Sequence, residues 1–160
     1  MSEMKGLDKL IMESQQKLGA IYHRYRQLER DCEYFIYRYS EDAEEIRSLK
    51  QILANRTLNY ELRLHLKIKL DSMVNTQKQQ LQKYARQKRL LPKIQVNIRS
   101  VDKLRIDQEN VKKLMVEAER SKFDKKSAQN YDKQFRAGLK KIDDQLNYYW
   151  NATKSNEFTV

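Results

Sequence analysis

The 160-residue chain contains only three glycines, one proline and one cysteine. So few turn-forming residues exclude a fold built from many short elements, because tight turns draw heavily on glycine and proline. A single cysteine excludes an intramolecular disulfide, which fits a reducing compartment. No stretch approaches the ~18 consecutive apolar residues of a membrane span, and the N-terminus lacks the apolar core of a secretory signal. These absences predict a helical, cytoplasmic protein without membrane insertion.

Residues that usually build catalytic and metal sites are also sparse. The two histidines, His23 and His65, have no carboxylate or cysteine at ligand spacing, whereas a zinc site needs three or four converging donors. Three isolated glycines cannot form a phosphate-binding loop. Cys32 lies among apolar residues, where a small buried thiol is the expected role. The sequence therefore predicts no enzyme, no metal, no cofactor and no small-molecule substrate.

What the chain does have is one apolar stripe from Met4 to Leu53, whose steps alternate between four and three residues. This is the 3.5-residue repeat of a helix packed lengthwise on another helix. Only Ser14 and Asp42 are polar on the stripe, and Asp42 is interpreted as a register-fixing residue or a partner contact. A helix of about 50 residues is ~75 Å long, so the pattern predicts a rod. The predicted core of this first arm comprises Leu18, Ile21, Tyr25, Leu28, Cys32, Phe35, Ile46, Leu49 and Leu53.

Beyond Leu53 the phase of the stripe is lost, and Asn and Thr residues follow that can cap a new helix. In the next segment, apolar residues from Leu62 to Leu70 alternate with a strand-like period of two, but no second strand is available to pair with them. Pro92 is expected to break or kink this segment, because proline lacks the backbone N–H and disfavours helix at the preceding residue. The seam then returns in a second arm, whose predicted core comprises Val111, Leu114, Phe135, Leu139, Ile142 and Leu146.

The predicted fold class is all-α, an elongated antiparallel coiled-coil hairpin of two long helical arms with a break or kink near Pro92. The first arm covers about residues 4–56, a basic middle segment about 58–99, the second arm about 100–151, and a frayed tail 152–160. The alternative is a three-helix arrangement with turns near Asn55 and Pro92. Residues 34–39 (YFIYRY) are apolar all round, which predicts burial by a third helix or by a partner protein.

Positive charge is concentrated in the middle of the chain. Residues 57–127 carry eighteen basic and eight acidic side chains, whereas residues 1–56 carry ten of each. No acidic residue lies between Asp71 and Asp102. Such a segment attracts an acidic protein surface, nucleic acid or anionic lipid. An acidic protein partner is favoured, and nucleic acid is disfavoured, because the run has no nucleic-acid-binding motif; it also lacks a continuous apolar face for membranes.

Short motifs in the first arm resemble a known family. They are Ile21, Arg24 and Tyr25 within IYHRY, then Ser48-Leu49-Lys50, then Asn55-Arg56 with Leu58. In this order, and over about residues 20–70, they resemble the invasion-type stalk proteins of type III secretion systems, which are similar to the flagellar export stalk protein. Pro92 and the long basic middle depart from the family pattern.

The resemblance implies a non-enzymatic stalk that links a hexameric export ATPase to the ring of the export gate and binds secretion chaperones. It also implies a location in the cytoplasm, peripheral to the inner membrane. We expect the partner contact near the hairpin bend, and the candidate residues are Asn55, Arg56, Leu58, Tyr60, Lys83, Arg86, Lys88 and Arg89. The alternatives are a generic coiled-coil adaptor or scaffold and a basic nucleic-acid-binding rod.

Overall fold

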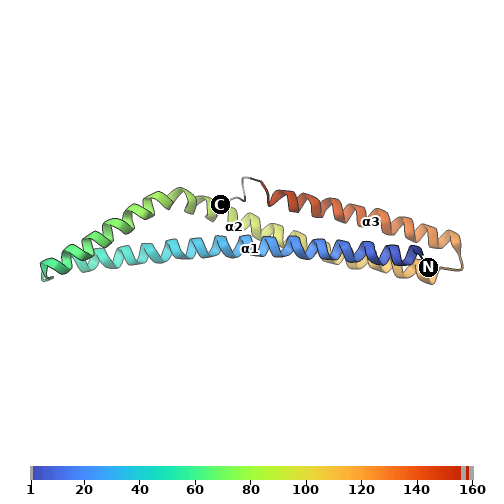
Figure 1. Cartoon of the computed structure of the whole chain (residues 1–160), viewed down its shortest axis with the longest axis horizontal. Helices are drawn as coiled ribbons and strands as arrows, with labels where there is room; N and C mark the ends of the chain where they lie inside the picture. The colour runs from blue at the N-terminus through green and yellow to red at the C-terminus, as the bar shows by residue number, and fades with distance from the viewer. Residues whose placement is uncertain (1, 156–157, 159–160) are drawn as a thin grey trace. The chain divides into compact units, whose positions relative to one another are not determined.

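The computed structural model describes residues 2–155 and 158, and the side chains of residues 6–155 and 158. Three helices account for nearly all of these residues: α1 spans Ser2–Leu53, α2 spans Tyr60–Arg120 and α3 spans Lys125–Ala152 (Figure 1). The described residues contain no strand, so the predicted all-α class is confirmed. Within this part of the chain, no helix has a stretch long and apolar enough to span a bilayer.

The described residues divide into two compact units. Unit 1 combines the chain up to Leu28 with the residues from Ile94 onward, and unit 2 is Glu29–Lys93. Helices α1 and α2 each contribute one part to unit 1 and one part to unit 2, while α3 belongs to unit 1 alone.

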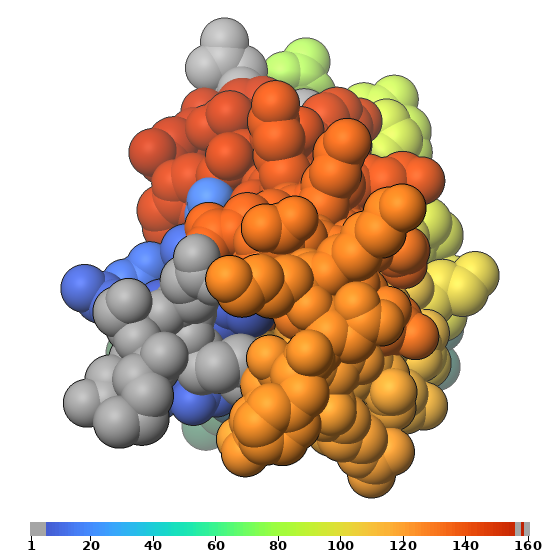
Figure 2. Space-filling view, turned by 90° about the vertical axis from the view of Figure 1, so that its right-hand side faces the viewer, coloured from blue at the N-terminus to red at the C-terminus, as the bar shows by residue number. Residues whose placement is uncertain are grey.

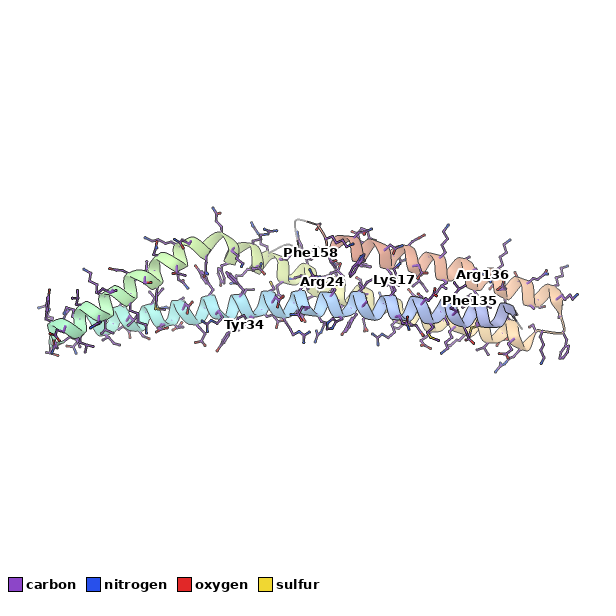
Figure 3. All side chains as sticks on the ribbon, viewed as in Figure 1. Lys17, Arg24, Tyr34, Phe135, Arg136 and Phe158 are labelled. Atoms are coloured by element: carbon purple, nitrogen blue, oxygen red, sulfur yellow. The ribbon has the colours of Figure 1, made fainter. Side chains whose placement is uncertain are left out.

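Unit 1 is a bundle of three helices, in which α3 runs parallel to α1 and antiparallel to α2. Early in α1, Ser14 Oγ donates a 2.8 Å hydrogen bond to Asp143 of α3. Further along α1, Tyr25 Oη donates a 2.6 Å hydrogen bond to the carbonyl of Tyr149, which lies further along α3. From α2, Gln108 Nε2 donates a 2.9 Å hydrogen bond to Ser14 Oγ. Phe135, which is fully buried, lies between α3 and α1 (Figure 3). Figure 2 views the end of this unit at which α2 passes into α3.

Unit 2 contains only two helical segments among its residues, the last part of α1 and the first part of α2, which pack antiparallel. Cys32 Sγ donates to the carbonyl of Gln87 at 3.1 Å, and the ring of Tyr39 stacks on that of Tyr84 with centroids 3.9 Å apart. Nearer the turn, Lys69 Nζ lies 2.8 Å from Glu45 Oε1. These contacts fix the register of the pair.

Pro92 does not end a helix, contrary to the expected break. It lies inside α2, on an exposed position, and the helix continues to Arg120. Leu90 and Ile94 on either side are 4% and 1% exposed. Burial of such side chains contributes ~1.5–3 kcal/mol each, which offsets a proline penalty of about 3 kcal/mol in a helix interior. The second arm therefore does not begin near residue 100.

The second turn lies at residues 121–124, inside the segment that was expected to be one continuous arm. Asp124 caps α3: its carboxylate accepts hydrogen bonds from the backbone N–H and the hydroxyl of Ser127, at 3.4 and 2.8 Å. These bonds lower the pKa of the Asp124 carboxyl. The expected seam ran through Ser121, Lys125, Ala128 and Asp132, which are small or polar, and this weak stretch marks the turn. The described residues thus form three helices, and their second turn lies about 30 residues beyond Pro92.

The structure buries twelve of the fifteen predicted seam residues and leaves three half-buried, namely Phe35, Leu53 and Leu114. Three further core residues lie on α2 where the basic middle segment was expected, namely Leu90, Ile94 and Ile98, and Val101 follows just beyond it. The side chain of Met4, the first residue of the stripe, lies outside the described ones.

The tail beyond Ala152 is packed at two positions, although residues 152–160 were expected to be frayed. Thr153 is 3% exposed and Phe158 is 4% exposed. The Phe158 ring meets the ring of Tyr25 edge to face, with centroids 6.1 Å apart. A buried aromatic side chain of this size adds a large apolar area to the core. Residues 156–157 and 159–160 of the predicted tail lie outside the described residues.

Burial by a third helix was one of the two expectations for residues 34–39, but the described residues of unit 2 include no third helix. Phe35, Ile36 and Tyr39 are half-buried, whereas Tyr34 and Tyr37 are 65% and 59% exposed. Tyr34 lies on the side of α1 that faces away from α2 (Figure 3). A partner protein at this stretch stays a prediction.

Candidate partner-binding surface

The turn of unit 2 is held by hydrogen bonds from its own side chains. Arg63 of α2 reaches back to the end of α1, where its guanidinium donates to the carbonyls of Leu53 and Asn55 at 2.9 and 2.6 Å. Asn59 Oδ1 accepts the N–H of Glu61 at 2.8 Å and caps α2. Together these bonds satisfy backbone groups that a helix end leaves without partners.

Of the four candidate residues at this turn, Asn55 has a structural role. Its Oδ1 accepts hydrogen bonds from the N–H and the hydroxyl of Thr57, at 3.1 and 2.7 Å, as in an Asx turn. Leu58 is half-buried, while Arg56 is exposed and Tyr60 is 77% exposed. Arg56 and Tyr60 are therefore the two that a partner can reach without dismantling the turn.

The other four candidates lie elsewhere on α2. From Tyr60 to Lys83 is 23 residues, or ~35 Å along a helix, so the structure does not bring the two groups together at the bend. Lys83 and Lys88 place their ammonium groups over the rings of Phe35 and Tyr84, at 4.6 and 5.3 Å from the centroids. Arg86 and Arg89 are exposed.

The strand-like alternation in the first turns of α2 has a helical explanation. Residues two apart on a helix are about 200° apart, so an apolar residue at every second position makes two opposite sides apolar. Leu66 and Leu70 are half-buried, whereas Leu64 and Ile68 are 48% and 61% exposed. One side therefore serves the pairing with α1, and the other leaves large apolar side chains in solvent. Sequence reasoning noted the alternation but missed the exposed residues as candidates.

The buried polar groups of unit 2 lie on the seam between α1 and α2. Burial raises the pKa of the Cys32 thiol to about 11, so the thiol is protonated at neutral pH and a weak nucleophile. Gln87 is 2% exposed, and its Nε2 has no hydrogen-bond partner among the described residues. Neither group is accessible to a substrate. The described residues hold no cluster of three or more His, Cys, Asp or Glu side chains suited to a metal ion.

Comparisons of the chain with protein-family models, with curated proteins and with solved structures find no match. The function is therefore argued from the residues and their arrangement.

Proposed function

We propose that the chain is a non-enzymatic stalk of a type III protein secretion export apparatus. In this role it joins the hexameric export ATPase to the ring of the export gate, and it binds secretion chaperones. The stalk works in the cytoplasm at the periphery of the inner membrane. Its seam is a coiled coil, and the chain is an elongated hairpin that bends near Pro92.

The observation that carries the proposal is the turn of unit 2, a hairpin end capped by hydrogen bonds and bearing large apolar side chains in solvent. Tyr60, Leu64 and Ile68 are 77%, 48% and 61% exposed within the first three turns of α2. Contiguous exposed apolar patches often mark sites of protein–protein interaction. The motifs of residues 20–70 that resemble the stalk family add the identity of the machine.

The test uses the purified full chain and the export ATPase encoded in the same secretion gene cluster. We expect the chain to cosediment with the ATPase hexamer and to stimulate ATP hydrolysis. An unchanged hydrolysis rate together with no cosedimentation would reject the stalk. Small-angle scattering of the chain alone checks the elongated hairpin, because a compact particle of this mass has a much smaller radius of gyration.

The gate contact is tested separately with Arg56→Glu and Tyr60→Ala, which leave the hydrogen bonds of Asn55, Asn59 and Arg63 intact. We expect both variants to bind the cytoplasmic ring domain of the gate more weakly, by about tenfold, since hot-spot residues of interfaces are often tyrosine and arginine. Arg89→Glu tests the basic part of α2 in the same assay. Equal binding by all three variants moves the gate contact away from this surface.

A further inference from the structure

A second stripe runs along α2 in unit 2, about 100° around the helix from the residues that pair with α1. Its steps alternate between four and three residues, like those of the seam itself. Its members are Tyr60, Leu64, Lys67, Asp71, Val74, Lys78, Leu81, Ala85 and Lys88. We refer to these nine residues as the flank stripe. A helix with two such stripes is built to pack against two neighbours, and unit 2 supplies only one.

Five of the nine members of the flank stripe are apolar, and most of these five are exposed. Tyr60, Leu64 and Leu81 are 77%, 48% and 55% exposed, and Val74 is half-buried. On α1, Ile36 and Ala43 are also half-buried.

These two α1 residues extend the same flank. The antiparallel register set by Cys32 with Gln87 and by Glu45 with Lys69 places Ile36 at the level of Leu81 and Ala43 at the level of Val74. Each follows a seam position by one residue, as Val74 and Leu81 do on α2. In an antiparallel helix pair, such equivalent positions lie on the same side.

The opposite flank of the seam is closed by polar contacts. There Lys69 pairs with Glu45 at 2.8 Å, and the Lys83 ammonium lies over the Phe35 ring. The two flanks therefore differ in chemistry, and only the flank stripe offers a run of apolar side chains for another element.

Charge identifies what covers this flank. Lys67, Lys78 and Lys88 recur on the stripe every ten or eleven residues, or ~16 Å, and Asp71 is its one acid. Residues 60–93 as a whole carry nine basic and two acidic side chains. An occupant needs apolar residues for the spaces between the lysines and acidic residues opposite them.

The fold of unit 1 shows the form that such an occupant takes. There a third helix, α3, covers the pair made by α1 and α2, and it buries Phe135, Leu139 and Ile142 against them. Unit 2 repeats the antiparallel pair without a third helix among its residues.

We infer that the flank stripe binds an acidic amphipathic helix of a partner protein. The partner helix lies lengthwise on α2 between Tyr60 and Lys88, with an apolar stripe interrupted by Asp or Glu every ten or eleven residues. This inference deepens the proposed function, because it names the chemical class of partner that the hairpin takes. It rests on that function only in treating unit 2 as the partner-binding part.

A second copy of the chain fits the flank less well. Pairing the stripe with itself in register brings lysines against lysines, which costs affinity. On α1, Glu33 follows the seam residue Cys32 and so lies on the same flank, whereas Glu41 precedes Asp42 and lies on the opposite flank. Glu41 of a second copy can therefore reach the stripe only in a heterologous contact, which does not close and builds open-ended assemblies.

The experiment measures the anisotropy of a fluorescent helical peptide of about 30 residues titrated with the full-length chain. The peptide carries leucine at four-three spacing and glutamate at every third position of that stripe. A peptide of the same composition in scrambled order is the control. We expect the designed peptide to bind at least about tenfold more tightly than the scrambled one, and more weakly as salt is raised.

Variants of the chain locate the contact. Leu64→Asp with Leu81→Asp is expected to weaken the binding of the designed peptide by about tenfold or more. Ile106→Asp is the matched control, because Ile106 is 62% exposed on the same helix but lies in unit 1. Lys67→Glu with Lys78→Glu is expected to weaken the binding of the acidic peptide and to strengthen the binding of a peptide with lysine in place of glutamate. Far-UV circular dichroism confirms that each variant is helical.

Three outcomes overturn the inference: equal affinity for the scrambled peptide, equal binding by the Leu64→Asp and Leu81→Asp variant, or a fall in the sedimentation mass of the free chain on that substitution. The last outcome assigns the flank to a second copy. The proposed stalk function stands or falls separately, on the ATPase assay, so a chain that stimulates the ATPase without binding the peptide contradicts this inference alone.

Discussion

Ser14 and Asp143 lie 129 positions apart in the chain, and Ser14 Oγ donates a 2.8 Å hydrogen bond to Asp143 Oδ1. The same hydroxyl accepts a 2.9 Å bond from Gln108 Nε2, so one buried serine joins α1, α2 and α3. Ser14 and Gln108 are both 2% exposed. A polar residue on an otherwise apolar stripe fixes the register, since any slip along the helices leaves these groups buried without partners.

Ser14→Ala is expected to lower the free energy of unfolding by ~1–3 kcal/mol, because it leaves the buried Gln108 amide without its acceptor. Denaturant unfolding followed by far-UV circular dichroism measures the change. Ser48→Ala, an exposed serine on the same helix, is the control. A second substitution, Gln108→Leu, should recover part of the loss if the orphaned amide is its cause, and no recovery would point to a different cause.

Much of α1 was predictable, because its stripe keeps one period from Leu7 to Leu53 and each member can be checked in the sequence alone. The turns were harder. At Pro92 a local rule predicted a break, but the side chains of Leu90 and Ile94 bury enough apolar surface to hold the helix together. The turn at residues 121–124 contains neither glycine nor proline. The sequence signal for this turn was the loss of apolar residues at the seam positions Ser121 and Lys125. This loss indicates that the chain does not pack against a neighbouring helix there.

The candidate surface was predictable only in part, for a physical reason. Side chains such as Asn55 and Arg63 look alike to a sequence reader whether they meet a partner or a backbone carbonyl. Whether such a side chain binds a partner or a backbone carbonyl depends on where the end of α1 lies. That position follows from the packing of α1 against α2. The flank stripe, in contrast, is present in the spacing of Leu64, Val74 and Leu81, but it becomes visible only once the seam beside it is known.

The hydroxyl of Tyr25 lies in the core of unit 1, where the side chain is fully buried. Desolvation raises its pKa to about 12, against a weaker opposing effect of the Asn97 amide, which donates to it at 3.4 Å. The folded-state pKa exceeds the ordinary value of about 10, so the unfolded chain ionises first as pH rises. Stability from this group is therefore fully present below pH 10 and is lost as pH rises from about 10 to about 12.

Tyr25→Phe separates this titration from the others. At neutral pH the variant should be less stable by ~1 kcal/mol, since it lacks the hydrogen bond to the Tyr149 carbonyl. Above pH 10 the difference should shrink and then reverse, because only the wild type loses stability through Tyr25, by roughly 3 kcal/mol at most. Unfolding curves of both proteins between pH 8 and pH 12 test this, and a constant difference across that range would contradict it.

The guanidinium of Arg63 gives a third prediction, at the turn of unit 2. Arg63→Ala removes two donors from the carbonyls of Leu53 and Asn55, and we expect the turn to open more readily by ~1–2 kcal/mol. Amide hydrogen exchange near residues 53–63 should speed up accordingly. Arg63→Lys should retain part of the protection, because an ammonium can still donate to one carbonyl. Lys67→Ala, one turn away and exposed, should leave the exchange rates of the turn unchanged.

Pro92→Ala tests the balance that keeps α2 continuous. Pro92 is exposed, so the substitution removes no buried contact, and alanine restores the backbone N–H that proline lacks. The helix should gain up to ~3 kcal/mol from this change, reduced by ~0.4–1 kcal/mol because the unfolded chain becomes more flexible. We therefore expect a higher melting temperature by circular dichroism, while Gln95→Ala, half-buried and three residues further along α2, should change it much less. A melting temperature that falls on Pro92→Ala would show that the proline is required where it is, and the burial of Leu90 and Ile94 would then not explain why α2 tolerates it.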